Sequence, residues 1–105
     1  MTISIENVWA LLQQHQQETF YTAKGLPFTY TIRGRELFVD RRQKSITIST
    51  VEKALEKIGR LQADGIAITG PKKIGCYGAS YLYPVLLALG IFSLSTPEEA
   101  GQLHF

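Results

Sequence analysis

Between positions 28 and 49 the chain contains three successive stretches in which apolar and polar residues alternate. Alternation puts every second side chain on the same face of an extended strand, so Phe28–Arg33, Glu36–Asp40 and Ser45–Ser49 are predicted to be β-strands. Gly34-Arg35 lies where a two-residue loop would join the first two strands, and residues 41–44 form the second turn. The pattern predicts a small antiparallel three-stranded sheet.

A helix is predicted directly after the third strand. Ser49 and Glu52 stand three residues apart, the spacing of a capping box in which Ser49 is the N-cap. Apolar side chains then recur at helical spacing from Thr50 to about Ala63, and Gly65 supplies the usual stop. This span is therefore predicted to be an amphipathic helix with one apolar face.

Two more helices are predicted on either side of these elements. One has Ser4 as its N-cap and ends near Gln17, and the other runs from Ala79 or Ser80 to Leu89 without a charged residue. Residues 66–69 have the composition of a short strand, and residues 96–99 that of a short terminal turn. The chain is thus predicted to be a single compact α+β domain over residues 1–105, with about three helices packed mainly on one face of the sheet.

The composition is that of an ordinary globular protein, with 45% apolar and 19% charged residues. The single cysteine, Cys76, has no partner for an internal disulfide, and the N-terminus lacks a signal-peptide pattern, so a cytoplasmic protein is predicted. Residues 74–97 carry no charge, but only Tyr81–Phe92 is strongly apolar, and Pro84 and Gly90 interrupt it. Because a membrane span needs about 20 apolar residues, we expect a buried core helix there and no membrane partner.

The positive charge is concentrated in the middle of the chain. Residues 24–73 contain all eleven cations and five carboxylates, a net charge of +6, whereas the two ends together carry −4. Such a basic segment suits a polyanion such as nucleic acid, and the alternative is a solvated surface without a partner. The candidate binding residues are Arg33, Arg35, Arg41, Arg42, Lys44, Lys72 and Lys73.

Aromatic residues occur among these cations. Tyr21 and Tyr30 lie on or beside the predicted sheet, and single-strand binding surfaces combine cations for phosphates with rings on which bases stack. The alternative is that Phe28 and Tyr30 form the core face of the sheet. The hairpin cations themselves are predicted to form one exposed surface.

Residues suited to catalysis or metal binding are sparse. His15 and Cys76 are the candidate base and nucleophile, but His15 lies among glutamines, as a solvated helix residue would, and a lone Cys is typically a small core residue. Gly70–Gly75 has the outer glycine spacing of a phosphate-binding loop, yet Cys76 and Tyr77 follow where that loop requires Lys and then Ser or Thr. No cluster of His, Cys, Asp and Glu has metal-ligand spacing. We therefore predict no enzyme activity, no metal and no cofactor.

A short glycine motif resembles part of a nucleic-acid-binding family. Residues 74–82, with Gly75 and Gly78, superficially resemble the Gly-X-X-Gly core of K-homology domains, in which that loop clamps a nucleotide backbone. That family has a helix directly before the loop, and Gly70-Pro71 is expected to block one here. The favoured interpretation is a glycine-rich helix entry that lets backbones pack closely.

A second resemblance covers about residues 19–87. Thr19–Tyr30, Ser45–Leu55 and Gly78–Tyr81, with Arg41 between them, resemble small uncharacterised bacterial domains that carry Gly-x-Pro-Phe-Thr-Tyr, a basic hairpin, a Ser-capped helix and Gly-Pro-Ser-Tyr. Ala79 stands where that pattern has Pro. The resemblance implies a compact bacterial module without an assigned reaction. Some such domains occur near nucleic-acid-processing or mobile-element proteins.

The sequence leaves two functions open, both of them non-catalytic. The first is binding of nucleic acid or another polyanion through the basic hairpin. The second is a protein-interaction or oligomerisation module, because the third predicted helix is more apolar than a one-sided surface helix requires.

Overall fold

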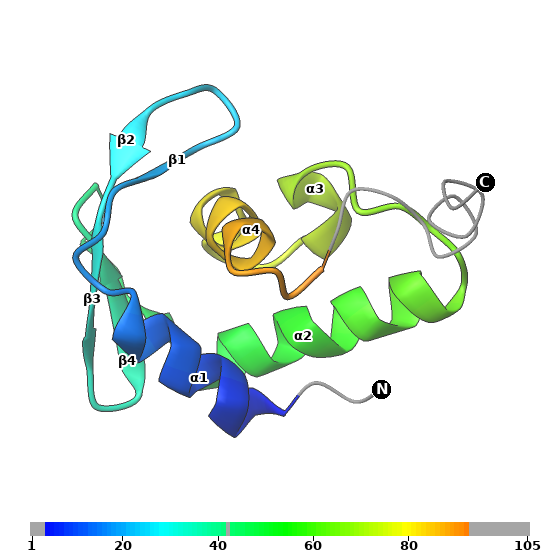
Figure 1. The fold of residues 1–105 in the computed structure, drawn as a ribbon, viewed down its shortest axis with the longest axis horizontal. Coiled ribbons are helices and arrows are strands. Elements are labelled where there is room, and N and C mark those ends of the chain that lie inside the picture. The colour runs from blue at the N-terminus through cyan, green and yellow to red at the C-terminus, as the bar shows by residue number, and fades with distance from the viewer. Residues whose placement is uncertain (1–3, 42, 93–105) are drawn as a thin grey trace.

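The predicted three-stranded sheet is present in the computed structural model, which describes residues 4–41 and 43–92 (Figure 1). Its strands pair antiparallel in the order β3 (Tyr30–Arg33), β4 (Glu36–Val39) and β5 (Ile46–Thr47). In the turn between β3 and β4, Gly34 has a φ of 61°, a value that residues with a side chain rarely adopt. The Gly34-Arg35 hairpin predicted from the sequence is therefore confirmed.

The first predicted strand is divided in two. Its first residues belong to β2 (Pro27–Phe28), which pairs antiparallel with β1 (Phe20–Tyr21) instead of with β4. Thr29 separates β2 from β3 and is held to the end of β4 by two hydrogen bonds, Thr29 N–H to Asp40 Oδ1 (3.1 Å) and Asp40 N–H to the Thr29 carbonyl (3.0 Å). Residues 20–28 form a two-stranded arm that extends beyond the main sheet (Figure 1).

The outer edge of β3 is covered by the segment that follows the first helix. The Gln17 N–H donates to the Tyr30 carbonyl (2.9 Å), and the Ile32 N–H donates to Oε1 of the Gln16 side chain (3.0 Å). The Gln17 side-chain amide also donates to Thr31 Oγ1. Residues 16 and 17 thus take the place of a fourth strand beside β3.

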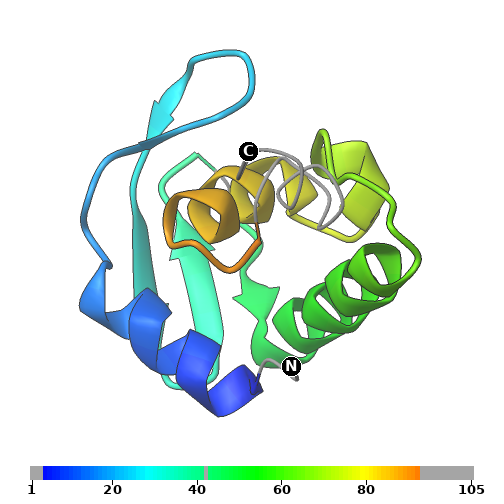
Figure 2. The same ribbon diagram turned by 45° about the vertical axis from the view of Figure 1, so that its right-hand side comes forward.

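The helices pack on one side of the sheet, as predicted. They are α1 (Ile5–Gln14), α2 (Ile48–Ala63), α3 (Pro71–Ile74) and α4 (Ala79–Ala88). Figure 1 shows α1, α2 and α4 on the same side of β3 and β4, and the turned view of Figure 2 brings α2 forward. The α+β class and the three-stranded sheet are confirmed, with the two-stranded arm as an addition.

The core lies between the inner face of the sheet and these helices. The Tyr30 hydroxyl donates to the Leu12 carbonyl (2.6 Å), and the Trp9 indole N–H donates to the Gly34 carbonyl (3.3 Å), so α1 is tied to both ends of β3. The uncharged stretch predicted to be a core helix is α4, whose Leu82 and Leu86 are almost completely buried. No helix in residues 4–41 or 43–92 is long and apolar enough to cross a membrane.

The start of α2 differs from the prediction. The helix begins at Ile48, and its N-cap is Thr47, whose Oγ1 accepts from the Thr50 N–H (3.3 Å). Ser49, predicted as the cap, lies inside the first turn. The predicted third strand is too long at its end, because Ile48 continues the alternation of apolar and polar residues but is the first residue of α2. The Ile48 N–H donates to the Arg35 carbonyl where the strand ends (2.9 Å).

Other boundaries also need correction. Helix α1 ends at Gln14 instead of near Gln17, because Gln17 adopts a φ of 73° and pairs with β3. Residues 66–69 form no strand. Pro71 does not block a helix, since proline suits the first helical position and begins α3 there. Pro84 lies in the second turn of α4. The turn predicted at residues 96–99 lies outside the described residues.

Candidate nucleic-acid interface

The described cations of the predicted site are all exposed. They occupy three places, namely the β3–β4 turn, the connection from β4 to β5, and α3, and Arg42 lies outside the described residues. These places hold, in that order, Arg33 with Arg35, Arg41 with Lys44, and Lys72 with Lys73. A four-residue strand separates the first two places by roughly 13 Å, a span that a few nucleotides can bridge.

The carboxylates near these cations are engaged in other interactions. Asp40 Oδ1 accepts from the Thr29 N–H (3.1 Å), and Glu36 Oε1 accepts from the Ser45 hydroxyl (2.6 Å). Among residues 4–41 and 43–92, the only ion pair joins His15 Nδ1 to Glu18 Oε2 at 2.9 Å. The described arginines and lysines of the hairpin are therefore not neutralised by direct contact with Glu36, Asp40 or Glu56.

Two of the cations are held in place by the fold. Arg41 Nε donates to the Pro27 carbonyl (2.6 Å), which holds the guanidinium end of this side chain against the arm. Lys44 Nζ lies 4.8 Å from the centroid of the Tyr77 ring, the range of a cation–π contact. The Tyr77 hydroxyl also donates to the Lys44 carbonyl (3.0 Å). Because Tyr77 follows α3 closely, this contact joins the β4–β5 connection to the helix that carries the other two lysines.

Of the two tyrosines predicted as stacking platforms, Tyr21 is exposed on the arm and Tyr30 faces the core. Phe28 and Tyr30 are 2% and 1% exposed, and Phe28 packs edge-to-face on Tyr81 with ring centroids 5.0 Å apart. Burial raises the pKa of the Tyr30 hydroxyl well above its ordinary value, so it stays protonated and donates to the Leu12 carbonyl. The alternative, that these two residues form the core face of the sheet, is confirmed.

The opposite face of the β3–β4 hairpin carries one residue of the predicted site, Arg33, and two that sequence reasoning did not include, Thr31 and Phe38. We call it the open face, and it presents Thr31, Arg33 and Phe38, with Thr31 paired directly across from Phe38. The Arg33 guanidinium carbon lies 5.9 Å from the centroid of the Phe38 ring. Phe38 is the one large apolar residue at an outward position of the predicted strands, and that exception to the alternation was the signal available in the sequence.

A hollow of about 240 Å³ lies on the open face. Its lining consists of Thr29, Thr31, Arg33, Phe38, Val39 and Asp40. One aromatic ring, one cation and one carboxylate therefore border the same depression, together with two hydroxyl side chains.

The second glycine of the Gly75–Gly78 pair serves packing. At Gly78, which has a φ of 77°, an added Cβ would lie 2.4 Å from Ile46 Cδ1 in β5. The close approach of α4 to the sheet therefore requires the absence of a side chain, as the favoured interpretation predicted. The four-residue α3 does precede the Gly75–Gly78 loop directly, so the objection that Gly70-Pro71 blocks a helix there was wrong.

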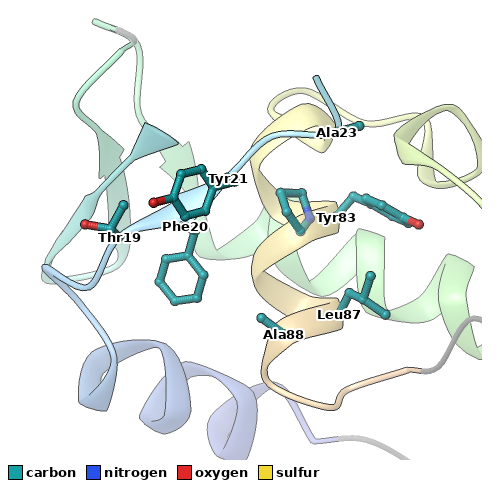
Figure 3. A pocket seen from close by; sticks show the side chains of 8 residues that line it. Thr19, Phe20, Tyr21, Ala23, Tyr83, Leu87 and Ala88 are labelled. Carbon is teal, nitrogen blue, oxygen red and sulfur yellow. The ribbon is translucent and has the colours of Figure 1, made fainter. Parts of the chain in front are cut away.

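A second depression, an apolar groove, lies on another part of the surface. It has a volume of about 480 Å³ and runs between β1 of the arm and α4 (Figure 3). Its lining consists of Thr19, Phe20, Tyr21, Ala23, Tyr83, Pro84, Leu87 and Ala88. Tyr21 is 60% exposed, and Leu26 on the same arm is 47% exposed.

The surroundings of the two candidate catalytic residues do not favour a base and a nucleophile acting together. His15 Nδ1 contacts the Glu18 carboxylate, and Cys76 is half-buried. Burial raises the pKa of the Cys76 thiol and so disfavours the thiolate that a nucleophile requires. In the described part of the chain, no three His, Cys, Asp or Glu residues come together in a way that could hold a metal ion.

Comparisons of the chain with protein-family models, with curated proteins and with solved structures gave no match. The resemblance to small bacterial domains stays a prediction from the sequence.

Proposed function

We propose that this protein is a non-catalytic module that binds nucleic acid through the open face of the β3–β4 hairpin and the cations at its two ends. The observation that carries the proposal is that the described cations of the hairpin are exposed and not paired with the neighbouring carboxylates. The hairpin cations Arg33, Arg35, Arg41 and Lys44 are exposed, and the nearby Glu36 and Asp40 accept hydrogen bonds from other groups.

The charge balance of the hairpin supports this function. Residues 33–44 contain five cations and two carboxylates, a net charge of +3 in a short segment. Cations that already lie in fixed positions, as Arg41 does against the Pro27 carbonyl, lose less side-chain entropy when they meet a phosphate. Phosphate contacts supply most of the sequence-independent affinity for nucleic acids.

The proposal is tested by measuring the affinity of labelled oligonucleotides over a range of salt concentrations. The wild type is expected to bind at low salt and to lose affinity as salt rises. The double variant Arg33→Gln/Arg35→Gln removes two cations from the exposed β3–β4 turn. If both contact phosphate, the slope of log affinity against log salt falls in magnitude by about 1.4 on single strands.

A charge-matched control comes from α2. The variant Lys53→Gln/Arg60→Gln also removes two exposed cations, but from a helix on the other side of the sheet. It is expected to keep the wild-type slope. A wild-type protein without oligonucleotide binding at low salt would overturn the proposal, and so would an equal loss of slope in both variants.

The second candidate function is self-association through the apolar groove. Two exposed apolar side chains, Tyr21 and Leu26, lie on the arm that forms one wall of this groove. Figure 3 shows that the other wall belongs to α4, which contributes Tyr83, Pro84, Leu87 and Ala88 to the lining. A second copy of this chain brings both an arm and a groove of the same kind, so arm and groove can match reciprocally about a two-fold axis.

Sedimentation velocity over a range of protein concentrations tests this second candidate. The wild type is expected to show a mass that rises with concentration, and Leu87→Glu is expected to remain a monomer because it places a charge in the groove. Ser80→Glu is the control, since Ser80 is exposed on the same helix outside the groove. A wild type that stays monomeric at all concentrations excludes this function and leaves nucleic-acid binding as it stands.

A further inference from the structure

We propose that the open face takes up one unstacked base of a single strand in the hollow beside Phe38, and that it prefers a base with an amino group over uracil or thymine. This inference rests on the proposed nucleic-acid function and adds the form of nucleic acid and the base chemistry that the same surface recognises. The hollow of about 240 Å³ provides the site.

The aromatic part of the hollow favours a single strand. Phe38 is half-buried on the open face, so its ring is held in place while part of it remains accessible. Bases stack on such rings without regard to their identity. A duplex keeps its bases stacked on one another, so a ring on a flat sheet can take a base only from an unpaired strand. The guanidinium carbon of Arg33 lies over this ring, 5.9 Å from its centroid, so the exposed Arg33 side chain has to move aside when a base stacks there, and it then suits the adjoining phosphate.

The carboxylate of the hollow determines which base is preferred. Asp40 Oδ1 accepts from the Thr29 N–H (3.1 Å), which fixes the direction of the side chain. A carboxylate repels phosphate, so within a basic surface it suits a hydrogen-bond donor on a base edge, as in the contact between an acidic residue and the N4 amino group of cytosine. Uracil and thymine offer a single ring N–H between two carbonyl oxygens, and a carboxylate repels both of these oxygens.

A hydroxyl group also lines the hollow. Thr31 pairs directly across from Phe38, and its Oγ1 already accepts from the Gln17 side-chain amide. Within the described residues this leaves the Thr31 O–H to donate to a ring nitrogen or carbonyl oxygen of the base. Cytosine presents both an amino donor and such acceptors on one edge, which matches the Asp40 and Thr31 groups together.

The experiment compares oligo(dC) with oligo(dT) of equal length by fluorescence anisotropy at low salt. The wild type is expected to bind oligo(dC) about tenfold more tightly, the effect of one hydrogen bond to a charged group. Asp40→Asn keeps an oxygen for the Thr29 N–H but removes the charge, so the dC/dT ratio is expected to fall close to one. The affinity for oligo(dT) should not decrease, because a repulsion is removed. Asp64→Asn makes the same change at an exposed position after α2 and is expected to keep the ratio.

A second variant separates stacking from charge. Phe38→Leu keeps an apolar side chain at this half-buried position but removes the ring, so binding of both oligonucleotides is expected to weaken about tenfold, with an unchanged salt slope. The Arg33→Gln/Arg35→Gln variant is expected to do the opposite and flatten the slope. Far-UV circular dichroism shows whether each variant is folded. If Phe38→Leu is unfolded, the Asp40→Asn variant alone tests the inference.

The outcomes distinguish this inference from the function on which it rests. A wild type that binds no oligonucleotide overturns both. Binding that is equally tight for oligo(dC) and oligo(dT) overturns only the inference, as does an Asp40→Asn variant that keeps the full dC/dT ratio. Binding of a duplex as tight as that of the single strand, with Phe38→Leu unaffected, also overturns the inference and leaves a phosphate-binding surface.

Discussion

Gly78 combines two constraints on a single residue. Its φ of 77° belongs to the left-handed region, and a Cβ placed there would lie 2.4 Å from Ile46 Cδ1 and 2.7 Å from Ile46 Cγ1. Ile46 is only 2% exposed, so its side chain has little room to move away. The first constraint concerns the backbone alone, and the second concerns the packing of α4 against β5.

The two constraints are separable by experiment, because Gly90 has the same φ of 77° but no atom of residues 4–41 or 43–92 within 4 Å of an added Cβ. Gly90→Ala is expected to lower the free energy of unfolding by about 1–2 kcal/mol, the cost of the left-handed conformation. Gly78→Ala is expected to cost about 1–3 kcal/mol more, because it also overpacks the core. Urea denaturation measures both, and equal losses would show that the contact with Ile46 relaxes without cost.

The cap of α2 gives a second prediction at the scale of one residue. Thr47 Oγ1 accepts from the Thr50 N–H, so Thr47→Ala is expected to lower the free energy of unfolding by about 1 kcal/mol. Ser49 is exposed in the first turn, and Ser49→Ala is expected to change stability by less than about 0.5 kcal/mol. A larger loss for Ser49→Ala than for Thr47→Ala in urea denaturation would place the cap where the capping-box motif had put it.

At the scale of elements, the longer periodic segments were predictable from the sequence and the shortest ones were not. The β3–β4 hairpin and helices α2 and α4 were found, because each repeats its pattern over several residues. The arm was missed because β1 and β2 have two residues each, too few for a period, and exist through the pairing of Phe20 with Phe28. Helix α3 has only four residues, too few for a helical period, and Pro71 begins it although Gly70-Pro71 predicts a break.

For the candidate site, the sequence was enough to predict the exposed cations but not the aromatic residue beside them. Exposure of Arg33, Arg35, Arg41 and Lys44 followed from the hairpin, whose turns and outward positions carry them. The choice of aromatic residues could not be made from the sequence, because Tyr30 and Phe38 lie on opposite faces of paired strands. Which face packs against the helices is decided by residues far away in the chain, such as Leu12, whose carbonyl oxygen accepts a hydrogen bond from the Tyr30 hydroxyl.

The covered edge of β3 yields a prediction at the element scale. Gln16→Ala removes the oxygen that accepts from the Ile32 N–H (3.0 Å) and leaves this half-buried donor without its partner. The free energy of unfolding is expected to fall by about 1–3 kcal/mol, and hydrogen exchange of the Ile32 amide is expected to accelerate. Gln13→Ala, at an exposed position of α1, is the control and is expected to leave both unchanged. Continued protection of the Ile32 amide in Gln16→Ala would show that another group accepts its hydrogen.

At the scale of the whole molecule, one core joins the sheet, the arm and the helices. Leu86 in α4 is 0% exposed and belongs to the cluster that also contains Leu12, Tyr30 and Ile58. These residues come from α4, α1, β3 and α2, so the core depends on contacts between segments far apart in the chain.

Leu86→Asp is therefore expected to unfold the protein, because an unpaired buried carboxylate costs several kcal/mol. Ser80→Asp places the same residue at an exposed position in the first turn of the same helix, where a negative charge is favourable, and is expected to remain folded. Circular dichroism with urea denaturation compares the two. A Leu86→Asp variant with the wild-type midpoint would show that α4 is not an essential part of the core.

The glutamine segment beside β3 also bears on how this protein behaves at high concentration. A bare strand edge recruits strands from other molecules and so nucleates aggregates with continuous intermolecular sheets. Here one edge of the sheet is occupied by Gln16 and Gln17, and the other is β5, which has two residues before the chain turns into α2. Growth of the sheet by addition of a foreign strand is thus blocked on both sides. Partners that bind at the three-stranded sheet are therefore expected to use side chains for recognition, and a mutation that frees the β3 edge creates a risk of amyloid-like assembly even where the fold survives.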